Sequence, residues 1–76
     1  MNSIDVYIGR RLNEARLACG LAPNDAAARL EISVDALAQI ESGEMRASAS
    51  LIFQATRAYD YPLAQLFETT VAVNDH

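Results

Sequence analysis

The hydrophobic residues at the start of the chain recur at the spacing of an amphipathic helix. Intervals of four, four and three residues place them on one stripe, whose members are Ile4, Ile8, Leu12 and Ala15. Ser3 is a suitable N-cap, because its hydroxyl can accept a hydrogen bond from a free amide of the first turn. Gly20 can supply a left-handed C-cap. The pattern therefore predicts a first helix between Ser3 and Gly20.

A second helix is predicted to begin at Pro23, a residue favoured at the first helical position. Asp25 falls in its first turn, where a negative charge complements the helix dipole. The apolar positions that this helix can bury are Ala26, Ala27 and Leu30.

A third helix follows after a turn of about three residues. Only Glu31 and Ile32 separate the second helix from Ser33, the next N-cap candidate. The third helix then covers roughly 34–41 and ends at Ser42-Gly43; it offers the core Leu37 and Ile40. Two short helices joined by so tight a turn are typical of a helix-turn-helix at residues 22–41.

Two more helices complete the predicted domain at residues 1–67. Ala47-Ser48 opens the fourth, whose apolar positions are Ile52, Ala55, Thr56 and Tyr59. Asp60 can form the following turn, and Pro62 starts a fifth helix that holds Leu63, Leu66 and Phe67. Residues 68–76 are either a frayed tail or an extension that pairs with a second copy, in which Val71-Ala72-Val73 could add an edge strand. The fold class predicted is all-α.

Composition narrows the class of protein. A chain of 76 residues has room for one domain with a small core, and 51% hydrophobic residues favour a packed globule. It contains no apolar run long enough to span a membrane and no basic start followed by an apolar stretch, so we expect a cytoplasmic protein. The net charge of −4 weakens attraction to nucleic acid. All six basic residues are arginines, the side chain best suited to bidentate contacts.

Groups for metal or covalent chemistry are scarce. Cys19 and His76, the single cysteine and histidine, cannot supply the four ligands of a structural zinc site. Cys19 is expected to be a buried or half-buried thiol, because free cysteine mostly behaves as a small hydrophobe. It has no evident base beside it, and the three glycines are too far apart to cradle a phosphate. We therefore expect no enzymatic activity, no metal and no cofactor.

The order of these motifs resembles the DNA-binding domain of the Cro and phage-repressor family, often called XRE-type regulators. The residues that carry the resemblance are Ile8-Gly9, Arg11-Leu12, Gly20-Leu21, Ala27-x-x-Leu30-x-Ile32-Ser33, Leu37-x-x-Ile40-Glu41-x-Gly43, Arg46, Ser48-Ala49-Ser50 and Ala58-x-x-Tyr61-Pro62-x-x-x-x-Phe67. The similarity covers about residues 6–67. It implies a five-helix, lambda-repressor-like fold that binds duplex DNA through its third helix as a homodimer.

The resemblance also implies an ion pair between Arg16 and Glu41. In this family, an arginine four residues before the first helix-exit glycine often pairs with a glutamate two residues before the next one, and Arg16 and Glu41 hold these positions. A bidentate, partly buried pair would fix the angle between the first and third helices. Two solvated surface charges are the alternative.

The residues that a recognition helix would present are unusually apolar and acidic. Gln39 can bond bidentately to adenine, Val34 and Ala38 could touch a thymine methyl, and Asp35 could accept from cytosine. The candidate phosphate contacts are Arg46, Arg10 and Arg11. Where the family usually has a serine cap and a glutamine, this chain has Ala22-Pro23. It has Glu31 where a glycine is usual, and Glu44-Met45 where basic residues are usual. We expect backbone strain at Glu31.

Two hypotheses of function remain open. The first is a small DNA-binding regulator, acting as a homodimer through the residues just named. The second is a diverged helix-turn-helix that has lost sequence-specific DNA binding and regulates through contact with a protein partner. Its contact face would consist of Val34, Ala38, Leu17 and Phe53.

Overall fold

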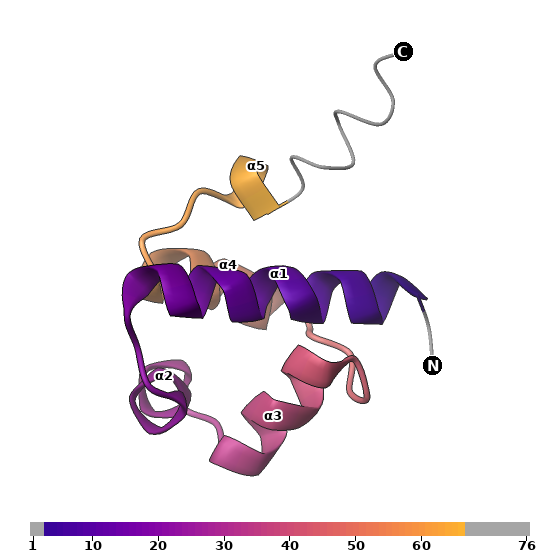
Figure 1. The fold of residues 1–76 in the computed structure, drawn as a ribbon, viewed down its shortest axis with the longest axis horizontal. Helices are drawn as coiled ribbons and strands as arrows, with labels where there is room; N and C mark the ends of the chain where they lie inside the picture. The colour runs from indigo at the N-terminus through magenta and orange to yellow at the C-terminus, as the bar shows by residue number, and fades with distance from the viewer. Residues whose placement is uncertain (1–2, 67–76) are drawn as a thin grey trace.

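The computed structural model describes residues 3–66, which form five helices and no strand (Figure 1). The helices are α1 (Ser3–Cys19), α2 (Pro23–Leu30), α3 (Val34–Ser42), α4 (Ala49–Ala58) and α5 (Leu63–Leu66). The predicted all-α class and the five-helix order are confirmed. The predicted tail at 68–76 and the strand at 71–73 lie outside the described residues. No described helix is both long enough and apolar enough to cross a bilayer.

The ends of the helices follow the local signals in the sequence. Pro23 is the first residue of α2, and Ser33 caps α3 through its hydroxyl, which accepts from the Ala36 amide at 3.0 Å. Ser48 caps α4 in the same way, accepting from the Leu51 amide at 3.0 Å. Gly43 ends α3 in the left-handed conformation, with φ of 87°. Each cap satisfies a backbone group that the helix itself leaves unpaired.

The core lies where α1, α2, α3 and α4 converge. Its buried apolar residues are Leu12, Ala15, Ala26, Ala27, Leu30, Leu37, Ile40, Leu51, Ala55 and Tyr59. The positions predicted on α2 and α3 are all present. On α4 and its C-cap, Ala55 and Tyr59 are buried as predicted, Leu51 is buried as well, and Ile52 and Thr56 lie at the margin of the core. A buried stripe centred slightly to one side of the predicted one is within the tolerance of a helical stripe about 100° wide.

Three apolar or thiol side chains are more exposed than predicted. Ile4, in the first turn of α1, is 67% exposed, although it continues the predicted apolar stripe. Cys19 is also exposed, in the last turn of α1 and away from the core, which corrects the expected buried thiol. Leu63 is exposed as well, at the start of α5.

Gly9 allows α1 to cross the end of α3 at very short range. A Cβ atom at this position would collide with the backbone oxygen of Ile40 and lie 2.8 Å from that of Glu41. Carbonyl oxygens within a helix cannot move aside as the end of a flexible side chain could. The absence of a side chain at Gly9 therefore sets the distance between the two helices.

Candidate nucleic-acid interface

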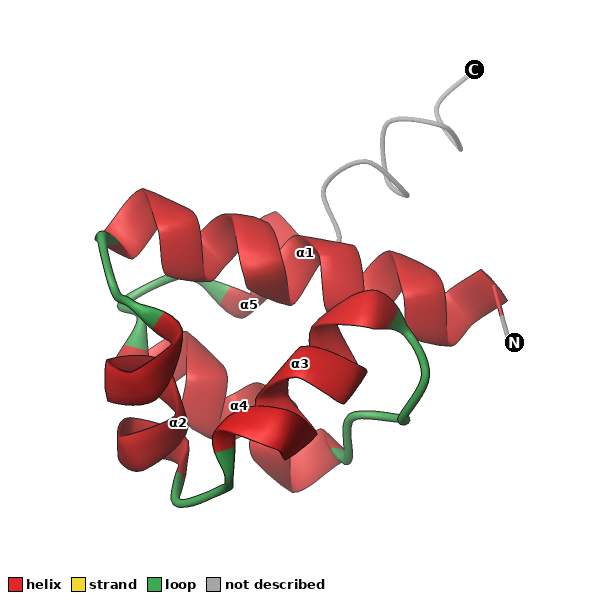
Figure 2. Cartoon of the chain, turned by 60° about the horizontal axis from the view of Figure 1, so that its bottom comes forward, coloured by secondary structure: helices red, strands yellow, loops and turns green. Residues whose placement is uncertain are grey.

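The α2–α3 unit is joined by the tight turn that the sequence predicts (Figure 2). The Ile32 amide donates to the Ala27 oxygen at 3.0 Å, and the Glu31 amide donates to the Ala28 oxygen at 3.2 Å, so the turn closes directly onto the end of α2. Glu31 has φ of 59°, in the left-handed region that favours glycine. The strain predicted at Glu31 is therefore present in its backbone conformation.

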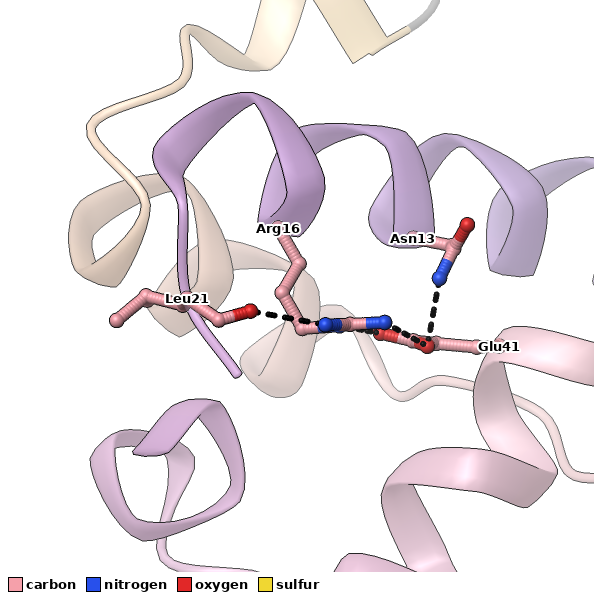
Figure 3. Close-up of polar contacts among 4 residues, drawn as sticks. All are labelled: Asn13, Arg16, Leu21 and Glu41. Carbon is pink, nitrogen blue, oxygen red and sulfur yellow. Dashed lines mark hydrogen bonds and ion pairs between the residues drawn. The ribbon is translucent and has the colours of Figure 1, made fainter. Parts of the chain in front are cut away.

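A network of four residues fixes α3 against α1 (Figure 3). The guanidinium of Arg16 contacts both carboxylate oxygens of Glu41, through Nε to Oε2 at 2.8 Å and Nη2 to Oε1 at 3.2 Å. Its Nη1 donates to the Leu21 oxygen at 2.8 Å, in the loop before α2. Donation to Glu41 raises the pKa of Arg16 above its ordinary value, although burial acts in the opposite direction. The guanidinium thus connects α1, the α1–α2 loop and α3.

Asn13 completes this network, a role that was not predicted from the sequence. Its Nδ2 donates to Glu41 Oε1 at 2.9 Å. Asn13 lies four residues after Gly9 and three before Arg16, so all three residues occupy the side of α1 that faces α3. That spacing was the available signal. With three donors on its carboxylate, Glu41 is held in a single orientation near the end of α3.

Tyr59 is buried under the same network with an unpaired hydroxyl. Its side chain is 3% exposed, and among the described residues its Oη has no hydrogen-bond partner. Burial, together with the negative charge of Glu41, raises the pKa of Tyr59 to about 12. The phenol is therefore neutral at physiological pH, and it contributes to the core through its ring.

Replacing Tyr59 with phenylalanine tests this description. At neutral pH, we expect Tyr59→Phe to leave the free energy of unfolding unchanged or to raise it by up to about 1 kcal/mol, because an unpaired buried hydroxyl is removed. The folded state holds the phenol proton more tightly than the unfolded chain, so wild-type stability should fall as pH rises from about 10 to 12. The variant should lack this part of the decline. Urea unfolding across that pH range measures both effects, and a marked loss of stability at neutral pH would instead indicate a bound partner for the hydroxyl.

The solvent side of α3 carries the four side chains predicted to face a ligand. Val34, Asp35, Ala38 and Gln39 are all exposed, whereas Leu37 and Ile40 point into the core. Gln39 is the one member of this set with both a donor and an acceptor on its side chain. The exposed face of α3 can therefore make amide hydrogen bonds at one position and small apolar contacts beside it.

The arginines predicted to flank α3 do not form one basic face. Arg46, in the loop after α3, donates from Nε to Asp5 Oδ1 at 3.1 Å, yet its side chain is 71% exposed. Its guanidinium therefore remains accessible while Asp5 holds the loop against the first turns of α1. Arg10 is exposed on α1.

Arg11, the third predicted phosphate contact, binds within the fold instead. Its Nη1 contacts Glu14 and its Nη2 donates to the Gln65 backbone oxygen, each at 2.6 Å, and its side chain is 16% exposed. Consecutive residues of a helix point about 100° apart. Arg11 is thus on the side of α1 that carries α5, not on the side that carries α3, and its charge is already compensated.

A family model described as "Helix-turn-helix domain" matches residues 8–68. The chain belongs to this family. No match was found among curated proteins. The match covers α2, the tight turn and α3, the two short helices of the helix-turn-helix. Family membership thus indicates a DNA-binding regulator in the broad sense.

Within residues 3–66, no three metal-ligating side chains are clustered.

Proposed function

We propose that this helix-turn-helix domain is a small, non-catalytic transcriptional regulator of the Cro and phage-repressor type, which binds duplex DNA through α3 as a homodimer. The observation that carries the proposal is the fixed presentation of α3. The Arg16–Glu41 contact and the Ser33 cap hold this helix, and its outer face exposes Gln39. A recognition helix needs both a rigid support and a side chain that can read a base edge.

The chemistry of α3 favours adenine and thymine in the target. Gln39 can donate to N7 and accept from N6 of adenine, while Val34 and Ala38 suit the thymine methyl group. Arg10 and Arg46 are the remaining candidates for phosphate contacts, and Ala22-Pro23 gives the start of α2 no side-chain donor. With about two phosphate contacts per protomer, log K should fall with log salt at a slope of about −4 for a dimer.

Binding of labelled duplexes selected from a randomised pool tests the proposal. Gln39→Ala should weaken binding by about 1–3 kcal/mol and reduce the preference for adenine at one position. Arg46→Ala should lower affinity on all sequences and make the salt slope shallower by about one for each protomer that loses a contact. Fluorescence anisotropy at two salt concentrations measures these effects, and sedimentation of the complex gives the number of protomers.

The matched control is Gln65→Ala, which removes an exposed glutamine side chain from α5. Its DNA affinity should equal that of the wild type. If no duplex is bound even at low salt, α3 is not a DNA-reading helix in this protein.

A second candidate function is contact between the α3 face and a protein partner. It is favoured by the acidic Asp35 in the first turn of α3 and by the engagement of Arg11 and Arg46 with carboxylates of the chain. Under this alternative, duplex binding is absent and Val34→Asp abolishes a specific protein complex, because it places a charge in an apolar contact.

A further inference from the structure

A shallow hollow between α2 and α4 brings together two arginines that have no role in the site described above. It has a volume of about 450 Å³ and is lined by Arg29, Gln54, Arg57 and Ala58. Arg29 belongs to the last turn of α2 and Arg57 to the last turn of α4. Both are exposed. No residue of α3 lines the hollow, so it is separate from the candidate DNA-reading face.

Neither arginine is neutralised within the part of the chain that the structure describes. Arg11, Arg16 and Arg46 each contact a carboxylate, but no carboxylate of residues 3–66 lies within 4.0 Å of the guanidinium of Arg29 or Arg57. The negative end of the helix dipole explains one arginine in the last turn of each helix. It does not explain why both line one hollow together with the amide of Gln54, in a protein with a net charge of −4.

An exposed aromatic ring extends this surface along α4. Phe53 is 62% exposed and lies one helical turn before Arg57, so the two side chains are neighbours on the helix surface. We call Arg29, Phe53, Gln54 and Arg57 the α2–α4 patch. Phenylalanine and arginine are among the residue types that are enriched in protein interfaces relative to the rest of the surface.

We propose that the α2–α4 patch binds an acidic segment of a partner protein. Two carboxylates of that segment pair with Arg29 and Arg57, each guanidinium being able to bind a carboxylate bidentately. An apolar side chain of the segment covers Phe53, and Gln54 supplies an amide between the charges. DNA phosphate is less well matched, because a phosphate group has no apolar surface that could cover the ring of Phe53. Since α3 lines no part of the patch, a partner bound there leaves α3 accessible.

A titration of the ¹⁵N-labelled 76-residue chain followed by NMR tests this proposal. The probe is a synthetic helical peptide with two glutamates four residues apart and one leucine, compared with the same peptide carrying glutamine at both positions. The glutamate peptide should shift the amide signals of the α2–α4 patch, and the glutamine peptide should bind at least about fivefold more weakly. Arg29→Gln and Arg57→Gln should each weaken binding by about two- to fivefold, the range of an exposed ion pair.

Arg10→Gln is the matched control, because it removes one exposed positive charge from another helix. It should bind the glutamate peptide within about twofold of the wild type, and all three variants should keep the wild-type melting temperature. Equal binding of the two peptides, or shifts outside the patch, overturns the proposal. A duplex that shifts the patch at lower concentrations than the peptide also overturns it, in favour of a phosphate contact. Failure of α3 to bind DNA has no bearing on these outcomes.

Discussion

Arg16→Ala is expected to destabilise the domain by about 3–5 kcal/mol, because it leaves the carboxylate of Glu41 in a largely buried position without its main partner. A domain of this size has a total stability on the order of 4–11 kcal/mol. The substitution should therefore remove a large part of that stability and lower the melting temperature by at least about 12 °C. Thermal unfolding followed by circular dichroism measures the change.

Two further variants separate the ion pair from other effects of Arg16. Arg10→Ala, which removes an exposed arginine from the same helix, should change the free energy of unfolding by less than about 0.5 kcal/mol. The double variant Arg16→Met/Glu41→Leu should recover most of the lost stability, since replacing both charges by apolar side chains leaves no unpaired carboxylate. An unchanged melting temperature for Arg16→Ala would falsify the structural role of the pair.

The network around Glu41 also illustrates how far the sequence could predict this site. Helix ends depend on a few neighbouring residues, so Pro23, Ser33 and Gly43 could be interpreted without knowledge of the rest of the fold. The pairing of Arg16 with Glu41 spans 25 residues of sequence and followed from the family resemblance, not from local patterns. Asn13 was missed because a polar residue on a helix gives no sign of its partner until the neighbouring helix is placed.

Exposure was harder to predict than helical position, because it depends on what covers each side chain. Ile4 continues the apolar stripe of α1, yet it is 67% exposed. Arg11 was predicted to contact phosphate from an exposed position, and its contact with the Gln65 oxygen depends on the position of α5. The surface of α3 was described correctly as exposed because caps and core positions together determine which side of a short helix remains free.

These differences change the electrostatic description of the candidate DNA interface. Of the three arginines predicted at its edge, Arg46 is restrained by Asp5 but largely exposed, Arg10 is exposed, and Arg11 contacts α5. Fewer phosphate contacts give lower non-specific affinity and weaker dependence on salt. Binding would then depend more on base contacts from Gln39 and its neighbours. A regulator of this kind has to locate its site with little help from long-range attraction.

The second large effect is expected from Gly9→Ala. An added methyl group would collide with the Ile40 oxygen, so α1 and α3 must separate or tilt. Alanine normally stabilises a helix relative to glycine by up to about 1 kcal/mol, whereas overpacking of this kind costs about 1–3 kcal/mol or more. The collision involves backbone atoms, which cannot rotate away, so we place the cost at the upper end of that range. After the gain in helix propensity is subtracted, we expect a net loss of about 2 kcal/mol. Urea unfolding measures it.

Gly20→Ala is the appropriate comparison, because a Cβ atom there meets no other atom within 4 Å and the cost comes only from its φ of +79°. That cost should be about 1–2 kcal/mol, the penalty for a left-handed residue with a side chain. Gly9→Ala should also lower DNA affinity at temperatures where the variant is fully folded, because the same contact sets the position of α3 relative to α1. Gly20→Ala leaves that contact intact and should bind DNA as the wild type does. If Gly9→Ala were as stable as the wild type, the close approach of α1 to α3 could not be what fixes the position of α3.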